Sequence, residues 1–494
     1  MNSTTTEREL PGEKCAVVGI FGEGMESARL VHTCLWSLQH RGQESSGIAS
    51  SEGTGIRIYK GTGLVAHVYD EEHLQLLSGY IAIGHNRYST SGASTLSHTQ
   101  PIMDEERTFT LAHNGNLPDT SKLEHFLVSH GIDPTPYNDS ELMYQAIKYH
   151  MQDGLSIESA IRKSFPLFTG AFSIVIMSKD KLIALRDPKG IRPLSLGKLN
   201  GGYIIASETC ALDTISGTFV RDIDPGEMIV IDKEGLKSFK LAKGETKLDI
   251  FEFVYFARPD SILLGKRVNE VRRNLGIHLA KECPIKADVV IPIPDSAIPA
   301  ALGYAGETGI PFDMGLIKNR YIHRTFIRPA QKLREKDVTV KLNPVPEIIE
   351  GKEVVIIDDS IVRGTTSGKI VEMIRRAGAA KVHMLISSPP VKYPDFYGID
   401  TPRQDDLIAS QMSVEEMRKV IGADSLYFLS YKGLIESTGL PEKMFCTSCF
   451  NGVYPMDIGK RIQEVKYPKK ITATKKHTKF HPHRTNTSHN YISL

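Results

Sequence analysis

The sequence is poor in several features that mark specialised classes of protein. It has six cysteines and one tryptophan in 494 residues, and its formal net charge is only +2. So few cysteines exclude a disulfide-rich secreted scaffold, and so small a net charge gives no general attraction to nucleic acid or membranes. No apolar run approaches the length of a membrane span, and residues 1–14 lack the apolar centre of a secretory signal. We therefore expect a cytoplasmic protein without a membrane or nucleic-acid partner.

The chain is long enough for two or three domains, and the patterning predicts two. From Cys15 to about Lys247, short apolar runs separated by Gly-rich turns predict strands, whereas 28–38 and 140–151 have helical spacing. This part should form stacked sheets with helices outside. After Phe251 the pattern alternates strand, loop, helix and strand, which is typical of a parallel α/β sheet.

The residues from Lys460 to the end are rich in Lys, Arg and His and have few large apolar side chains. Such a segment cannot bury enough surface to order itself, so we expect a disordered basic tail. The alternative interpretation is a tail that contacts RNA or phosphate surfaces.

The most informative string is VVIIDDSIVRGTTS, residues 354–367. Its four apolar residues predict a buried strand, and Asp358 and Asp359 stand at the carboxyl end of that strand, where parallel sheets bind ligands. Gly364 and the hydroxyl residues after it lead into a helix predicted over 369–377, and a helix start is an anion site. The sequence therefore predicts a phosphate site beside two carboxylates. The alternative is a turn whose Asp and Thr residues only cap the helix.

This string resembles the phosphoribosylpyrophosphate (PRPP) motif of type I phosphoribosyltransferases. The resemblance implies that Asp358 and Asp359 hold the ribose hydroxyls and a Mg²⁺ complex. It also implies that a loop cradles the 5-phosphate, and we assign to PRPP binding Ser360, Arg363, Gly364, Thr365, Thr366 and Ser367. Asp295 and Ser296, after the strand VVIPIP, match the pyrophosphate loop, with Ser296 near the metal.

The polar and basic segment 320–341 suits a mobile lid over pyrophosphate. Its cationic residues are Arg324, Arg328, Lys332 and Arg334. The alternative is a solvated surface loop.

The segment CAVVGI begins at Cys15 and resembles the start of the class II, N-terminal-nucleophile glutamine amidotransferases. A thiol has a pKa of about 8.5 and a freed α-amine one of about 8, so the amine of Cys15 could relay the thiol proton near neutral pH. We therefore predict cleavage between Lys14 and Cys15. By itself, a cysteine before an apolar strand is more often a small core residue.

Further strings match the same amidotransferases in order: LQHRGQESSGI with Arg41, IGHNRYST with Arg87, HNG with Asn114 and Gly115, and NDSE with Asp139. By resemblance, Asn114 and Gly115 form the oxyanion hole, and Arg41, Arg87 and Asp139 bind glutamine. The planar guanidinium of an arginine suits bidentate hydrogen bonding to the substrate carboxylate. The strings RDPKGIRPL and ASETCALD complete the match.

The order of both halves resembles the glutamine phosphoribosylpyrophosphate amidotransferase family over residues 15–455. The resemblance implies an αββα sandwich followed by a type I phosphoribosyltransferase parallel-sheet domain. It implies glutamine-dependent amination of PRPP in purine biosynthesis, with Mg²⁺, homo-oligomers (dimers or tetramers) and purine nucleotide effectors. The expected divisions are a propeptide (1–14), a glutaminase domain (15–247), a phosphoribosyltransferase domain (248–459) and a tail (460–494). FEFVYFARPDS, residues 251–261, should lie at the interface that shields ammonia.

One departure concerns an iron–sulfur cluster that many family members hold with four cysteines. By local match, the four positions here are Asp249, Asp395, Cys446 and Cys449. Clusters favour thiolates, so this set excludes an ordinary four-cysteine cluster. Two alternatives stay open: a cluster or zinc ion on this mixed set, and a metal-free fold in which the aspartates pair with cations.

Two rival functions complete the predictions. One is an ammonia-dependent transferase or glutaminase that has lost coupling. The other is a regulatory protein that uses the phosphoribosyl fold to sense nucleotides, but a sensor has no use for the thiol of Cys15 or for an oxyanion hole.

Overall fold

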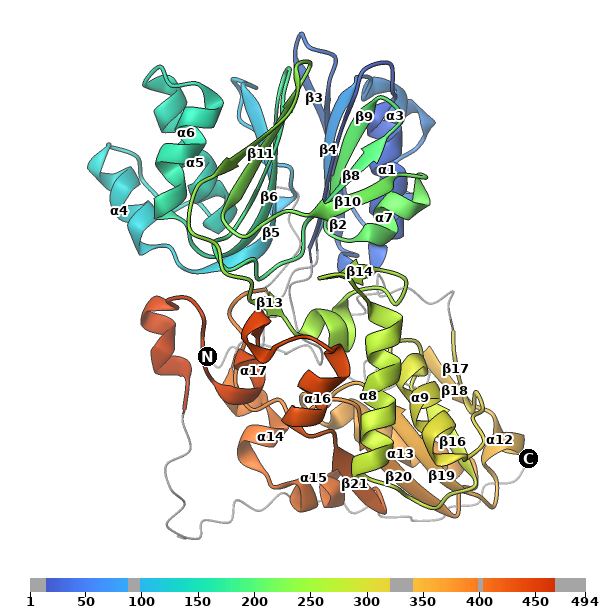
Figure 1. Cartoon of the computed structure of the whole chain (residues 1–494). Coiled ribbons are helices and arrows are strands. Elements are labelled where there is room, and N and C mark those ends of the chain that lie inside the picture. Colours follow the sequence, from blue (N-terminus) through green and yellow to red (C-terminus); the bar gives the residue numbers. More distant parts are fainter. Residues whose placement is uncertain (1–14, 88–97, 320–340, 399–402, 467–494) are drawn as a thin grey trace, which may run out of the picture.

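A computed structural model describes residues 15–87, 98–319, 341–398 and 403–466 (Figure 1). The chain forms an upper half of two packed antiparallel sheets and a lower half around a parallel sheet (Figure 1). Among the described residues, no helix is long and apolar enough to span a membrane.

The first sheet of the upper half has seven strands in the order β10-β8-β9-β1-β4-β2-β3. Their bounds are β1 Ala16–Gly22, β2 Ser45–Ser51, β3 Ile56–Thr62, β4 Ile81–Arg87, β8 Ser195–Leu199, β9 Gly202–Ala206 and β10 Thr218–Asp222. The second sheet has the order β12-β11-β7-β6-β5. Its strands are β5 Phe109–Asp119, β6 Thr169–Ser178, β7 Leu182–Arg186, β11 Glu227–Asp232 and β12 Gly235–Lys240. All neighbouring strands in both sheets run antiparallel.

The two sheets pack face to face around an apolar core that includes Val17, Ala112 and Val175. Helices cover the outer faces, so the upper half has four layers (Figure 1). The seven-stranded sheet carries α1 (Ser27–Ser37), the turn η1 (Gln39–Arg41), α2 (Val65–Val68), α3 (Glu71–Leu76) and α7 (Thr209–Thr214). The five-stranded sheet carries α4 (Ser121–Ser129), α5 (Asp139–Gln152) and α6 (Ile157–Ser164). Helices α1 and α5 agree with the helical spacing of the sequence.

The lower half is built on a parallel sheet in the order β16-β19-β20-β21. Its strands are β16 Val289–Pro292, β19 Glu353–Asp358, β20 Lys381–Ile386 and β21 Ser425–Phe428. One face packs against α8 (Val268–Glu282) and α9 (Ile298–Thr308), and the other against α13 (Thr365–Arg376) and α15 (Val414–Ile421). The expected α/β sheet is therefore present.

Helix α13 begins earlier than the sequence predicts. We expected its start at Lys369, but the helix starts at Thr365. Gly364 precedes it with a φ of 80°, a left-handed conformation that glycine adopts without strain. The hydroxyl residues 365–367 therefore lie within the first helical turn rather than in a loop before it.

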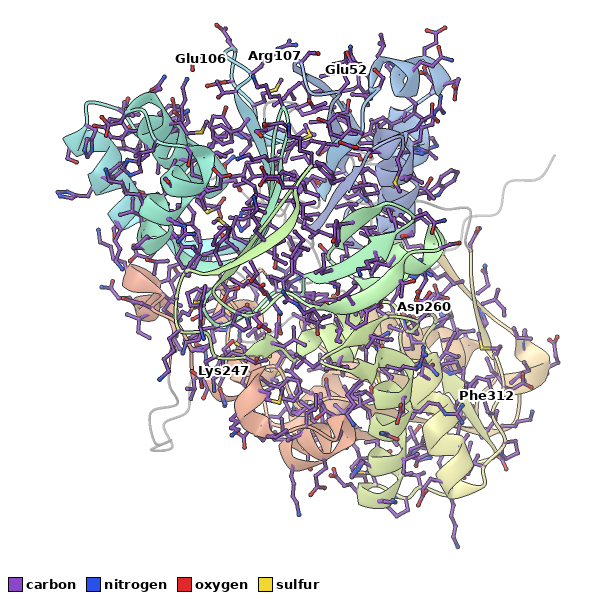
Figure 2. All side chains as sticks on the ribbon, turned by 45° about the horizontal axis from the view of Figure 1, so that its top comes forward. Glu52, Glu106, Arg107, Lys247, Asp260 and Phe312 are labelled. Carbon is purple, nitrogen blue, oxygen red and sulfur yellow. The ribbon has the colours of Figure 1, made fainter. Side chains whose placement is uncertain are left out.

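The two halves meet along the segment after Lys247, and Figure 2 labels Lys247 and Asp260 at this boundary. Strand β13 (Leu248–Asp249) pairs with β22 (Phe445–Cys446), and the π-helical turn η4 (Glu252–Phe256) follows. A mixed core joins Ala171 and Ile191 of the upper half to Phe396 and Tyr397 of the lower half. The FEFVYFARPDS segment thus lies at the interface, as expected.

The basic tail begins later than Lys460. The turn η7 (Gly459–Glu464) is ordered, Val465 is buried in the mixed core, and Lys466 N donates to Gln404 Oε1 at 2.6 Å. Val465 and the preceding Ile458 bury apolar surface in this core. The basic composition averaged over residues 460–494 gave no indication of this burial. The remaining tail residues, 467–494, lie outside the described residues.

Candidate active sites

Cys15 lies at the edge of the central strands of the upper half. It directly precedes β1, which pairs with β4 on one side and β9 on the other. Ala16 pairs with Asn86, so Cys15 lies beside Arg87, the last residue of β4. Cys15 is half-buried. The predicted propeptide, 1–14, lies outside the described residues.

Asn114 of β5 reaches across to the strand that carries Cys15. Its Nδ2 donates a hydrogen bond to Ser207 Oγ at 3.4 Å, and Ser207 Oγ also accepts from Val17 N at 2.9 Å. All of these groups are buried. Ser207 therefore connects the predicted oxyanion-hole amide to β1. The string ASETCALD contained this serine, but nothing local in it indicated the role.

Gly115 occupies a position that only glycine fits. Its φ is 149°, and a Cβ there would lie 2.0 Å from Ala171 O and 2.8 Å from His113 Nε2. A side chain would therefore displace the backbone of the neighbouring β6. The requirement explains why the predicted oxyanion hole has glycine after Asn114.

Asp139 begins α5 behind the same strand. Its Oδ2 accepts from Leu117 N at 3.1 Å and its Oδ1 from Ser140 N at 2.7 Å. Ser140 Oγ lies 2.9 Å from His113 Nδ1, which adds a further contact between α5 and β5. Asp139 is thus joined to β5 at Leu117, close in the chain to Asn114 and Gly115.

Arg41 does not lie in the glutamine site. Its guanidinium is fully buried, with ion pairs from Nε to Glu208 and from Nη2 to Glu252. Although burial opposes the charge, these two carboxylates raise the pKa of Arg41. The structure places Arg41 behind the site, with its charge already matched. Arg87 is only partly buried, and its Nη1 donates to His98 O at 2.6 Å.

In the lower half, the acid pair stands at the carboxyl end of β19. Asp359 is buried, with Oδ2 accepting from Ser296 Oγ and Oδ1 from Ser360 Oγ at 2.6 Å. Burial and the neighbouring Asp359 carboxylate raise the pKa of Asp358 well above its usual value. Two hydroxyls therefore meet the Asp359 carboxylate, and Asp358 lies beside it. Such an oxygen-only set fits Mg²⁺, which proteins hold with one or two carboxylates while substrate phosphates and water complete the shell.

The predicted phosphate loop leads from this pair into α13. Thr365, Thr366 and Ser367 form its first residues, and the N–H groups of a first helical turn have no intrahelical acceptor. Arg363 Nη2 lies 3.8 Å from Asp406 Oδ2 beside this turn. The arrangement offers hydroxyl, amide and guanidinium donors to one phosphate group.

Asp295 follows β16 at the same edge of the sheet, after a cis peptide bond with Pro294. Its carboxylate is half exposed and lies 2.6 Å from Lys318 Nζ. Ser296 is thus the member of this loop that contacts the acid pair. The predicted lid residues Arg324, Arg328, Lys332 and Arg334 lie outside the described residues.

The aspartates at the predicted cluster position already have protein partners. Asp249 Oδ2 accepts from Arg192 Nη1 at 3.1 Å, and Asp249 Oδ1 accepts from Phe251 N at 3.0 Å. Asp395 accepts from Ser448 Oγ at 2.9 Å and from Tyr397 N at 2.7 Å. Each of the two carboxylates therefore already accepts hydrogen bonds from protein donors.

The cysteines of this position complete the same network. Strand pairing sets Cys446 beside Asp249, and Cys446 Sγ lies 3.3 Å from Ser448 Oγ. Burial, reinforced by the nearby aspartates, raises the pKa of the Cys446 and Cys449 thiols. Across the described ranges, no group of three or more His, Cys, Asp or Glu side chains is placed to hold a metal ion. The residues present do not fit a cluster or a zinc ion.

Comparisons with known proteins agree with the two halves. Residues 85–214 match a family model described as a glutamine amidotransferase domain, and residues 262–393 match one described as a phosphoribosyl transferase domain. The amidophosphoribosyltransferase of Synechococcus elongatus is 48% identical over 467 residues, covering 92% of this chain and 94% of its own. The chain belongs to the amidophosphoribosyltransferase family.

Solved structures of this family have the same fold. A Bacillus subtilis glutamine PRPP amidotransferase complexed with ADP and GMP has a TM-score of 0.83 and 43% identity, covering 90% of this chain and 98% of its own. An allosteric regulatory enzyme of purine biosynthesis has a TM-score of 0.85 and 42% identity, covering 92% of this chain and 99% of its own. The predicted αββα sandwich followed by a phosphoribosyltransferase sheet is confirmed.

As an amidophosphoribosyltransferase, this protein is an enzyme that transfers ammonia from glutamine to PRPP, giving phosphoribosylamine, glutamate and pyrophosphate in purine biosynthesis. The predicted activity is confirmed, and the hypothesis of a nucleotide sensor is wrong. The roles of individual residues follow as proposals.

Proposed function

We propose that Cys15, released as the chain start by removal of residues 1–14, is the nucleophile of the glutaminase. The observation that carries the proposal is that Cys15 lies beside the end of β4, which carries Arg87, while Ser207 connects Asn114 of β5 to Val17 of β1. Residues 15–247 then form the glutaminase domain, and residues 248–459 form the phosphoribosyltransferase domain. Ordered chain continues to Lys466.

In the first half-reaction, the α-amine of Cys15 accepts the thiol proton, and the sulfur attacks the side-chain amide of glutamine. Asn114 Nδ2 and Gly115 N–H donate to the oxygen as negative charge develops on it. The protonated α-amine then returns the proton to the amide nitrogen, the bond to that nitrogen breaks and ammonia leaves, and water hydrolyses the thioester to glutamate and the free thiol. Arg87 grips the α-carboxylate of glutamine, and Asp139 holds its α-amine.

In the second half-reaction, ammonia attacks the ribose C1 of PRPP, and pyrophosphate leaves. Asp358 and Asp359 accept hydrogen bonds from the ribose hydroxyls, and the first turn of α13 holds the 5-phosphate. Ser296 and Asp295 lie along the path of the pyrophosphate. When bound at Asp358, Asp359 and Ser296, Mg²⁺ supplies positive charge that offsets the charge on the departing pyrophosphate.

We also propose that the Asp249 and Asp395 position works without a cluster. Its polar atoms are supported by Arg192, Ser448 and backbone N–H groups instead. Hydrogen bonds to Asp249 and Asp395 stabilise these buried carboxyl groups. This polar network holds β13 against β22 and needs no metal.

Purine nucleotides are the effector class we propose, because the Bacillus subtilis relative is complexed with ADP and GMP. Assembly into homo-oligomers and a cytoplasmic location remain predictions from the sequence.

The experiment that tests the nucleophile compares two nitrogen sources. Cys15→Ala should abolish phosphoribosylamine synthesis from glutamine and keep synthesis from added ammonia. Retention of the glutamine-driven reaction would show that another group attacks the amide.

A further inference from the structure

Five buried charged side chains meet where the two halves join. Arg41, Arg192 and Glu208 come from the glutaminase half, and Asp249 and Glu252 come from the segment that follows it. The exposed fraction of each is 1% or less. Charges so fully withdrawn from water are stable only when they are paired, so their arrangement is closely determined.

In this network, Glu252 links Arg41 to Arg192. Its Oε1 lies 3.3 Å from Arg41 Nη1 and 2.9 Å from Arg192 Nη2, and its Oε2 accepts from Arg41 Nη2. Glu208 takes the remaining Arg41 Nε–H and also accepts from Ser261 Oγ at 2.7 Å. The side chain of Arg41 is therefore held between one carboxylate of the glutaminase half and one of the joining segment.

On the glutamine side, the turn that follows Arg41 packs against the end of β4. Gly42 follows Arg41, and a Cβ on Gly42 would lie 2.6 Å from Asn86 C and 2.7 Å from Arg87 N. The turn is further joined to β4 by a hydrogen bond from Glu44 N to Arg87 O at 3.0 Å. A shift of Arg41 would thus move the backbone that carries Arg87.

On the phosphoribosyl side, Glu252 is the first residue of η4, a π-helical turn of a kind found often at functional sites. Arg272 of α8 holds this turn by donating to Phe253 O at 2.8 Å and Ala257 O at 2.9 Å. Burial lowers the pKa of Arg272 to about 10, and Asp359 is the strongest of the acids that oppose the shift. Arg272 therefore lies within electrostatic reach of the PRPP acid pair.

We propose that Glu252 is a positioning residue that couples the two half-reactions. It holds Arg41, and through the Gly42 turn Arg87, in one orientation relative to η4, so that ammonia is released in line with the acceptor site. The proposal rests on the proposed function, in which Arg87 grips glutamine. Because the carboxylate of Glu252 is fully buried and engaged by Arg41 and Arg192, its loss should disturb coupling rather than chemistry.

The test is Glu252→Gln, which keeps the shape and removes the charge. We expect the KM for glutamine to rise about tenfold and the ratio of phosphoribosylamine to glutamate to fall below that of the wild type. The rate with added ammonia should change less than about twofold, which also reports that the variant is folded. Glu245→Gln, an exposed partner of Lys189 in the same segment, is the matched control and should behave as wild type.

A second variant keeps the test decisive if Glu252→Gln does not fold. Arg41→Lys keeps the charge but loses the two-pronged contact, and it should give the same pattern. Equal losses with glutamine and with ammonia, or an unchanged ratio and KM, would overturn the proposal. Arg87→Ala separates it from the proposed function: if that variant keeps the wild-type KM for glutamine, the assignment of Arg87 fails, whatever Glu252 does.

Discussion

Asn114 and Ser207 are joined by a buried hydrogen bond, in which Asn114 Nδ2 donates to Ser207 Oγ at 3.4 Å. The same oxygen accepts from Val17 N, so one hydroxyl connects the predicted oxyanion hole to the strand that starts at Cys15. The amide has a second N–H, and this contact leaves it for the substrate oxygen. Preorganised donors of this kind are among the largest contributions to catalysis.

Ser207→Ala should therefore lower kcat with glutamine by about tenfold, because the Asn114 amide loses its orientation. The KM for glutamine and the rate with ammonia should stay close to wild type. Steady-state assays with both nitrogen sources measure this. Ser195→Ala, another buried serine of the same sheet, is the control. Equal effects of the two substitutions would refute the role of Ser207.

Asp359→Asn should impair the other half-reaction. Removing one charge of the acid pair weakens the grip on Mg²⁺ and the ribose, so synthesis should fall by about a hundredfold with either nitrogen source. Hydrolysis of glutamine should fall much less, since it occurs in the other domain. Asp424→Asn, on an exposed ion pair with Arg375, serves as the control. Undiminished synthesis from ammonia in Asp359→Asn would contradict the assignment.

His85 should make the glutaminase half sensitive to acid. Its Nε2–H donates to His113 O at 3.1 Å, and burial, with Arg87 nearby, lowers the pKa of His85 to about 3. Between pH 3 and about 6.5 the unfolded chain binds a proton that the folded chain excludes, so stability falls as the pH falls through this window.

From pH 7.5 to 5.5, His85 should therefore cost about 1.4 kcal/mol of unfolding free energy. His85→Gln keeps a donor and cannot titrate, so its urea denaturation should lose that part of the pH dependence. An unchanged difference between the two pH values in His85→Gln would show that His85 is not responsible.

Restoring the two missing cysteines at the cluster position should allow the protein to bind iron. Protein purified without oxygen should contain no stoichiometric iron, whereas Asp249→Cys/Asp395→Cys should bind about four iron atoms per chain and absorb visible light. Elemental analysis and absorption spectra measure both. Stoichiometric iron in the unaltered protein would contradict the metal-free account.

The reactive residues could be predicted because each stands in a local pattern with a physical meaning. Asp358 and Asp359 end a buried parallel strand, and sheet geometry makes that end a ligand site. The start of α13 was misplaced because propensity alone disfavours Thr and Ser, whereas Gly364 lets the chain turn directly into the helix.

The role of Arg41 could not be predicted in the same way. Its partner Glu252 is 211 residues away along the chain, and no local pattern relates them. The sequence around Asp249 likewise did not indicate that Arg192 is its hydrogen-bond partner. Long-range pairing of buried charges is decided by how the two halves pack, which composition and periodicity do not encode.

The central claim is that the thiol of Cys15 acts from a newly formed chain start. Intact-mass spectrometry of active enzyme, with peptide mapping after labelling by a thiol-reactive glutamine analogue, tests it most directly. The account predicts a chain that begins at Cys15 and carries the label on Cys15, in step with loss of glutamine-dependent activity. Fully active protein that still carries residues 1–14, or label on another cysteine, would contradict it.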